Sequence, residues 1–186
     1  RSERESELNT FLLADASRDG ARRSILYTLP LYTMSDELLE RILTRHGVAD
    51  EQKDAIQRHA AAQRQRVLAI LAAGTVEDEI SVIPPEEFGT NPPALELSGI
   101  FCEEDLSYTA EEDAAHLRET EAFAAANPNY TLTQSAAHAF RNLQILIHEG
   151  QWAMVPKSKA PAVHFVIRHP KLRSAIESFI PPVTED

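Results

Sequence analysis

The 186-residue sequence has few of the residues that build several common kinds of site. Its single cysteine, Cys102, cannot form an internal disulfide, and nothing points to an oxidising compartment. Its six glycines form no phosphate-binding loop, and no G-x-S-x-G motif for a serine nucleophile occurs. No apolar run approaches the roughly 20 residues that a membrane helix needs. We therefore expect a cytoplasmic protein without a membrane partner.

Positive charge is scarce as well. Eighteen lysines and arginines stand against 29 acidic residues, which gives a net charge of −11. A nucleic-acid-binding surface must neutralise phosphates with basic side chains, so this chain is not expected to hold DNA by itself. The basic residues do gather in three groups, which we interpret as solvated faces and helix ends. These groups are Arg18, Arg22 and Arg23; Arg64 and Arg66; and Lys157, Lys159, Arg168, Lys171 and Arg173.

Histidine is the remaining source of metal or acid–base chemistry. The seven histidines are His46, His59, His116, His138, His148, His164 and His169. His148-Glu149 is not followed by a second histidine three residues later, so the zinc-protease helix motif is absent. Two histidines and a carboxylate such as Glu149 could still converge in the fold, but scattered histidines are more often surface or core residues. We predict no catalytic residue, no metal site and no cofactor.

Apolar periodicity and capping residues predict five helices. Ser35 is a suitable N-cap, Leu38, Leu39, Ile42 and Leu43 form one apolar face, and Gly47 ends that helix. Asp50 is expected to cap a longer helix that ends at Gly74, and Thr109 with Glu112 forms a capping box. The predicted helices are roughly 3–17, 35–45, 50–73, 109–126 and 170–180.

Alternating apolar and polar residues predict strands, most clearly at Leu143, Ile145 and Ile147. Glu149-Gly150-Gln151 is a compact reversal that predicts a hairpin. The strongest predicted strands are 129–134, 143–148, 152–155 and 162–167. Weaker patterns favour a short strand or extended loop over 22–31 and an edge strand over 79–83.

This order of elements predicts an α+β fold. We expect a helical N-terminal part, and then a small antiparallel sheet, a β-meander, with a C-terminal helix. The two parts are 1–74 and 75–186, together forming one compact domain, with 1–20 as a linker helix.

Aromatic and basic residues of the predicted sheet suggest a ligand-binding pocket. We expect a concave face lined by Tyr130, Trp152 and Phe165, with His164 and Arg168 as polar anchors. The alternative, which is the more ordinary arrangement, is that Trp152 and Phe165 face each other as core on neighbouring strands.

Three short segments, together with the order of elements, carry a resemblance to a known family. They are Arg23, Ile25 and Tyr27; Leu29-Pro30-Leu31-Tyr32-Thr33; and Arg64-Gln65-Arg66-Val67-Leu68. The chain resembles the effector domain that follows a Cro/cI-type (XRE) helix-turn-helix in bacterial transcription regulators. It departs from that family's turn, because Tyr32 stands in place of a glutamine and a glycine is missing.

The resemblance implies an effector-sensing and dimerisation domain of a transcription regulator. It implies a homodimer, a small molecule or peptide as effector, and DNA binding through a helix-turn-helix upstream of Arg1 that this fragment lacks. A metal-dependent or acid–base enzyme that uses the histidines is one alternative. A non-catalytic interaction module that pairs through the alanine-rich helix around Ala60, Ala61 and Ala62 is another.

Overall fold

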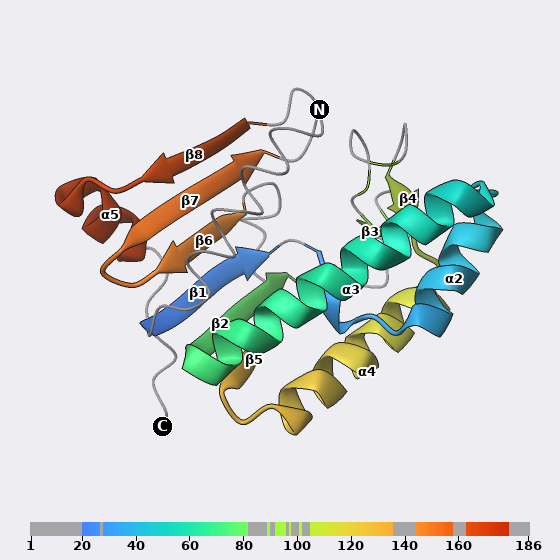
Figure 1. Cartoon of the computed structure of the whole chain (residues 1–186), viewed down its shortest axis with the longest axis horizontal. Helices are drawn as coiled ribbons and strands as arrows, with labels where there is room; N and C mark the ends of the chain where they lie inside the picture. The colour runs from blue at the N-terminus through green and yellow to red at the C-terminus, as the bar shows by residue number, and fades with distance from the viewer. Residues whose placement is uncertain are drawn as a thin grey trace.

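The computed structural model describes residues 20–26, 28–81, 89, 92–95, 97, 101, 105–135, 144–157 and 163–178 (Figure 1). The helix predicted over 3–17 and most of the predicted linker lie outside these residues. The strands are β1 (Gly20–Leu26), β2 (Gly74–Ser81), β3 (Ala94–Leu95), β4 (Leu106–Ser107), β5 (Tyr130–Ser135), β6 (Ile145–His148), β7 (Trp152–Lys157) and β8 (Val163–Ile167). The helices are a 3-10 turn η1 (Leu31–Thr33), α2 (Asp36–Arg45), α3 (Asp50–Ala73), α4 (Ala110–Ala126) and α5 (Pro170–Glu177).

The fold is α+β, as predicted, but its sheet is not a small antiparallel meander. Six strands form one mixed sheet in the order β5-β2-β1-β6-β7-β8. Strands β1, β2 and β5 are parallel, whereas β6, β7 and β8 continue the sheet in antiparallel fashion. Three of the four strands of the predicted meander, β6, β7 and β8, form one half of this larger sheet, whereas the first, β5, pairs in parallel with β2 at the opposite edge. Strands β3 and β4 form a separate two-stranded hairpin.

Strand β1 confirms the short strand favoured over 22–31 for residues 22–26 and corrects the expectation that the N-terminal part is helical throughout. It lies in the middle of the sheet, where Ser24 pairs with Asp78 of β2 and with Leu146 of β6. Of the strand predicted at the edge, over 79–83, residues 79–81 belong to β2, which lies between β1 and β5, and 82 and 83 lie outside the described residues. Gly74 ends α3 and starts β2 directly, and a Cβ at this position would clash with the carbonyl oxygen of Gly20 in the neighbouring strand. The sheet thus takes strands from both halves of the chain.

The two faces of the sheet are covered differently (Figure 1). Helices α3 and α4 lie over the parallel half on one face, and Leu71, Val76 and Tyr130 form a core between them and the strands. On the opposite face, Ile176 of α5 packs against an apolar cluster of the central and antiparallel strands. That cluster consists of Ile25, Ile145, Ile147 and Ala153. A third core joins α2, α3 and the β3–β4 hairpin, beside the sheet.

Local signals placed most helix starts correctly. The Ser35 side chain accepts a hydrogen bond from the Leu38 N–H at 3.1 Å, and Thr109 and Glu112 form the predicted capping box. Asp50 does not cap α3, because Ala49 occupies the cap position and Asp50 is the first helical residue.

Among the residues that the structure describes, no helix combines the length and the apolar character required to span a membrane.

His116 of α4 joins that helix to the turn before α2. Its ring is fully buried, with Nε2 3.1 Å from the Pro30 carbonyl oxygen and Nδ1 3.1 Å from the Tyr108 hydroxyl. A neutral ring satisfies both contacts, because Nε2–H donates to Pro30 and Nδ1 accepts from Tyr108. Burial lowers the pKa of His116 from 6.5 to about 4.

This buried imidazole predicts a loss of stability in mild acid. The unfolded chain takes up the proton below about pH 6.5, whereas the folded protein does so only near pH 4. The stabilisation is therefore complete above pH 6.5 and falls by roughly 3 kcal/mol as the pH drops to 4. Urea unfolding of the wild type and of His116→Gln at several pH values should show a smaller acid-induced loss in the variant.

Exposed His169 offers the matched control, since His169→Gln should keep the wild-type pH profile. Burial raises the pKa of Asp113 to about 6, which has the opposite effect on stability in this window. Because all three proteins contain Asp113, its contribution cancels when they are compared. Parallel profiles of wild type and His116→Gln would contradict the prediction.

Candidate functional site

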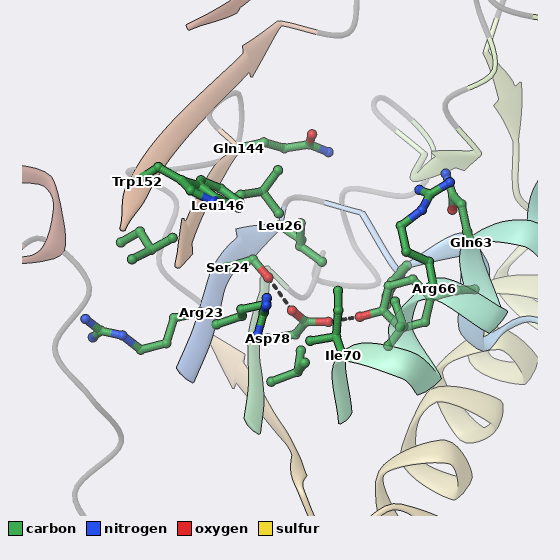
Figure 2. Close-up of a pocket in the computed structure, with 16 residues that line it drawn as sticks. Arg23, Ser24, Leu26, Gln63, Arg66, Ile70, Asp78, Gln144, Leu146 and Trp152 are labelled. Carbon is green, nitrogen blue, oxygen red and sulfur yellow. Dashed lines mark hydrogen bonds between the residues drawn. The ribbon is translucent and has the colours of Figure 1, made fainter. Parts of the chain in front are cut away.

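A cavity of about 310 Å³ lies between α3 and the middle of the sheet (Figure 2). Its walls combine apolar side chains with arginine, amide and hydroxyl groups. The sheet contributes Arg22, Arg23, Ser24, Leu26, Val76, Asp78, Leu146, Ile147 and Trp152, and Gln144 precedes β6. Helix α3 contributes Gln63, Arg66, Val67 and Ile70, and the turn around η1 contributes Pro30 and Tyr32. The volume lies at the small end of the range of about 300 to 1,000 Å³ that small-molecule sites occupy.

The cavity lies beside the strand at which the sheet changes direction. The chain adds β2 and then β5 on one side of β1, and then returns to place β6 on the other side. Strand β1 therefore has a parallel neighbour on one side and an antiparallel neighbour on the other. Reversals of strand order are frequent positions for small-molecule sites in sheets with parallel strands.

Asp78 forms the floor of the cavity, and its side chain is 2% exposed. Hydroxyl groups from three other elements donate to its carboxylate: Ser24 to Oδ1, and Tyr32 and Tyr130 to Oδ2. The Tyr130 oxygen lies 2.8 Å from Oδ2. Figure 2 shows Ser24 and Asp78 facing each other from adjacent strands beneath the cavity. One carboxylate thus ties β1, β2, β5 and η1 together.

Burial and hydrogen bonding act on Asp78 in opposite directions. Burial raises the pKa of the carboxyl, while the hydrogen bonds from Ser24, Tyr32 and Tyr130 work against that rise. Burial and the nearby Asp78 charge raise the pKa of both tyrosines well above 10, so both hydroxyls remain protonated donors. The rings of Tyr32, Phe123 and Tyr130 contact one another edge to face behind these hydroxyls.

Two arginines of α3 have different roles. Arg64 donates from Nε to the Tyr32 carbonyl at 3.0 Å and from Nη2 to the Met34 carbonyl, and so fixes η1 against the helix. Arg66 borders the cavity, and its buried Nε has no hydrogen-bond partner among the described residues. Burial lowers the pKa of Arg66. In Figure 2, Gln63 and Arg66 rise from α3 on the side of the cavity across from Gln144, Leu146 and Trp152.

The structure separates the five residues predicted to form a pocket. Trp152 is 5% exposed and lines the cavity. Tyr130 lies on the same face of the sheet but contacts Asp78 from behind and does not line the cavity. Phe165 is 61% exposed on β8 and pairs with Val155, which places its side chain on the face opposite to that of Trp152. The two aromatic rings therefore do not face each other.

The two predicted polar anchors do not join this group. Arg168 is an exposed residue just after β8 and is not among the residues that line the cavity. His164 belongs to the backbone of β8, but its side chain lies outside the described residues.

The residues that sequence reasoning missed are Asp78, Arg66 and Arg22. Asp78 stands between Glu77 and Glu79 in a run of acidic residues, which made it look like a solvated strand face. A signal was nevertheless present, because Val76, Asp78 and Ile80 alternate in register and share one buried face. A charge at the centre of such a buried triplet indicates a buried polar network or a site.

The histidines do not meet in the described part of the chain. No group of three or more His, Cys, Asp or Glu residues there is arranged to hold a metal ion. The two fully buried histidines serve different parts of the fold: His116 contacts Pro30 and Tyr108, and His148 contacts the Trp152 ring edge to face. His138 lies outside the described residues.

Comparisons with protein-family models, with curated proteins and with solved structures found no match to this chain.

The Asp78 network predicts that Tyr32→Phe destabilises the protein more than Tyr108→Phe does. Tyr32 donates to a buried carboxylate, whereas the Tyr108 hydroxyl contacts a neutral imidazole. Hydrogen bonds to charged groups contribute about 1.5–3 kcal/mol and neutral ones about 0.5–1.5 kcal/mol. Urea unfolding at pH 7 should show this order, and the difference should shrink when acid protonates Asp78. Equal losses at pH 7 would mean that Asp78 is not charged in the folded protein.

Proposed function

We propose that this chain is the effector-binding domain of a bacterial transcription regulator, and that the cavity beneath α3 holds a small-molecule effector. The observation that carries this proposal is the cavity itself. It combines an apolar wall from Val67, Ile70, Leu146 and Trp152 with a few placed polar groups. This is the usual composition of a small-molecule site.

The segments that resemble the regulator family support the proposal, because they meet at the cavity. The segment from Leu29 to Thr33 contributes Pro30 and Tyr32 to its wall, and the segment from Arg64 to Leu68 contributes Arg66 and Val67. Arg64 joins the two segments through the carbonyls of Tyr32 and Met34.

In this proposal the domain acts as a homodimer, and a separate helix-turn-helix contacts DNA. The net charge of −11 fits a domain that senses and does not itself bind phosphates. The effector acts by binding one arrangement of the dimer more tightly than another, which shifts the population between them.

The test uses the only tryptophan of the chain, Trp152, as a reporter in the cavity wall. A diverse metabolite library is screened by thermal unfolding, and hits are verified by a change in Trp152 fluorescence. A ligand at one hundred times its Kd stabilises a protein by about 2.7 kcal/mol, which corresponds to roughly 5 to 10 °C in Tm at this size. We expect hits of this strength that also alter Trp152 emission.

A matched pair of variants on α3 locates the binding. Val67 lines the cavity, so Val67→Phe should fill it and abolish binding. Ala69 is exposed on the same helix, so Ala69→Phe should leave binding unchanged. Hits that bind Val67→Phe as tightly as the wild type would refute the cavity as the effector site, as would a library without any hit.

A further inference from the structure

Charged side chains of both signs line the cavity. Two arginines, Arg22 and Arg66, and one carboxylate, Asp78, lie in its walls. Arg23 also borders it, but its Nε pairs with the Glu149 carboxylate at 3.1 Å. Arg22 donates a hydrogen bond to the Gly20 carbonyl within its own strand, and the Asp78 carboxylate accepts three hydroxyl hydrogen bonds. Arg66 is therefore the charged wall group that remains for a ligand, and its positive charge favours an anion.

Arg66 is the arginine of the cavity wall that makes no hydrogen bond at its buried Nε with the described residues. Arg64, two residues earlier, is occupied by two backbone carbonyls. Arg66 makes no ion pair with any described residue, and its buried Nε lacks a hydrogen-bond partner among them. A buried polar group without a partner costs free energy, which a bound acceptor would recover. The planar guanidinium is suited to bind a carboxylate through two parallel hydrogen bonds.

The opposite assignment, a cationic ligand held by Asp78, has less support. Both carboxylate oxygens already accept hydrogen bonds from Ser24, Tyr32 and Tyr130. The side chain is 2% exposed, and three hydroxyl donors already neutralise much of its need for a cation. Asp78 therefore serves as a structural anchor below the ligand.

The remaining walls indicate the rest of the ligand. Val67, Ile70, Leu146 and Trp152 offer apolar surface, and Gln63 stands beside Arg66 in Figure 2, whereas Gln144 lies across the cavity from it. A volume of about 310 Å³ admits one ring or a short branched chain better than a nucleotide. The single guanidinium of Arg66 also matches one negative charge better than a polyanion.

We infer that the effector is a small monocarboxylic acid with a compact apolar body, its carboxylate bound by Arg66 and its body against Val67, Ile70 and Trp152. This inference rests on the proposed function, because it names the chemical class of the ligand for the same cavity.

The test compares carboxylates with the corresponding primary amides, which have nearly the same shape but no charge. The pairs are benzoate and benzamide, phenylacetate and phenylacetamide, and isovalerate and isovaleramide, with inorganic phosphate as an anion without an apolar body. Binding to the whole chain is measured by calorimetry. We expect at least one acid to bind tenfold or more tightly than its amide and than phosphate.

Variants of α3 assign that preference to Arg66. Arg66→Gln should weaken binding of the acid at least tenfold and leave binding of the amide unchanged. Arg66→Lys should retain part of the preference for the acid, because it keeps the charge but not the two parallel hydrogen bonds. Arg58 is an exposed arginine of the same helix. Arg58→Gln therefore removes one charge as a control and should change the affinity for neither ligand. Circular dichroism verifies that each variant is folded.

The possible failures of this inference and of the proposed function are distinguishable. If amides bind as tightly as acids, and Val67→Phe abolishes the binding of both, the inference of an anionic ligand is wrong. The proposal that the cavity is an effector site would then still stand. If phosphate binds as tightly as the acids, the inference that the ligand has an apolar body is wrong. Acids that bind Val67→Phe as tightly as the wild type would place the anion outside the cavity, which contradicts both proposals.

Discussion

The parallel half of the sheet depends on one buried carboxylate. Asp78 accepts hydroxyl hydrogen bonds from Ser24 on β1, Tyr32 on η1 and Tyr130 on β5, which are separated by 54, 46 and 52 residues from it in sequence. A charge removed from water in this way is costly unless every lone pair is satisfied. The network therefore holds three elements in one geometry, because moving any of them would leave the carboxylate without a donor.

This constraint also shapes the cavity above it. Both carboxylate oxygens of Asp78 accept hydroxyl hydrogen bonds from the surrounding strands and from η1. Asp78 is therefore a fixed part of the cavity floor and not a reactive group. Arg64 extends the same rigidity to the side wall, because it fixes the carbonyls of Tyr32 and Met34 to α3. The floor and this side wall are thus held by contacts within the protein, and such preorganisation lowers the cost of binding a ligand against them.

Features that depend on neighbours along the chain, such as helix caps, could be predicted from the sequence. Features that depend on pairing between distant segments could not. Ser35 and the Thr109–Glu112 pair act within four residues, so their roles could be read directly. The place of β1 in the sheet could not, because its Arg22 and Arg23 resemble a solvated surface until β2 and β6 lie on either side. Asp78 was hidden for the same reason, since its donors come from three distant segments. A period-2 pattern shows which face a residue shares but not whether that face is covered.

Helix α3 is the element through which the cavity and the rest of the molecule are coupled. Its first half is fixed in the helical core by Ile56 and Ala60, which are fully buried, whereas Val67 and Ile70 of its second half border the cavity. Its 24 residues extend over about 36 Å. A ligand that contacts both α3 and the sheet would favour one position of the helix against β1 and β2, because its binding free energy depends on both walls being present. Because α3 is one continuous helix, a shift of its second half would also displace Ile56 and Ala60 and so act on the core around α2.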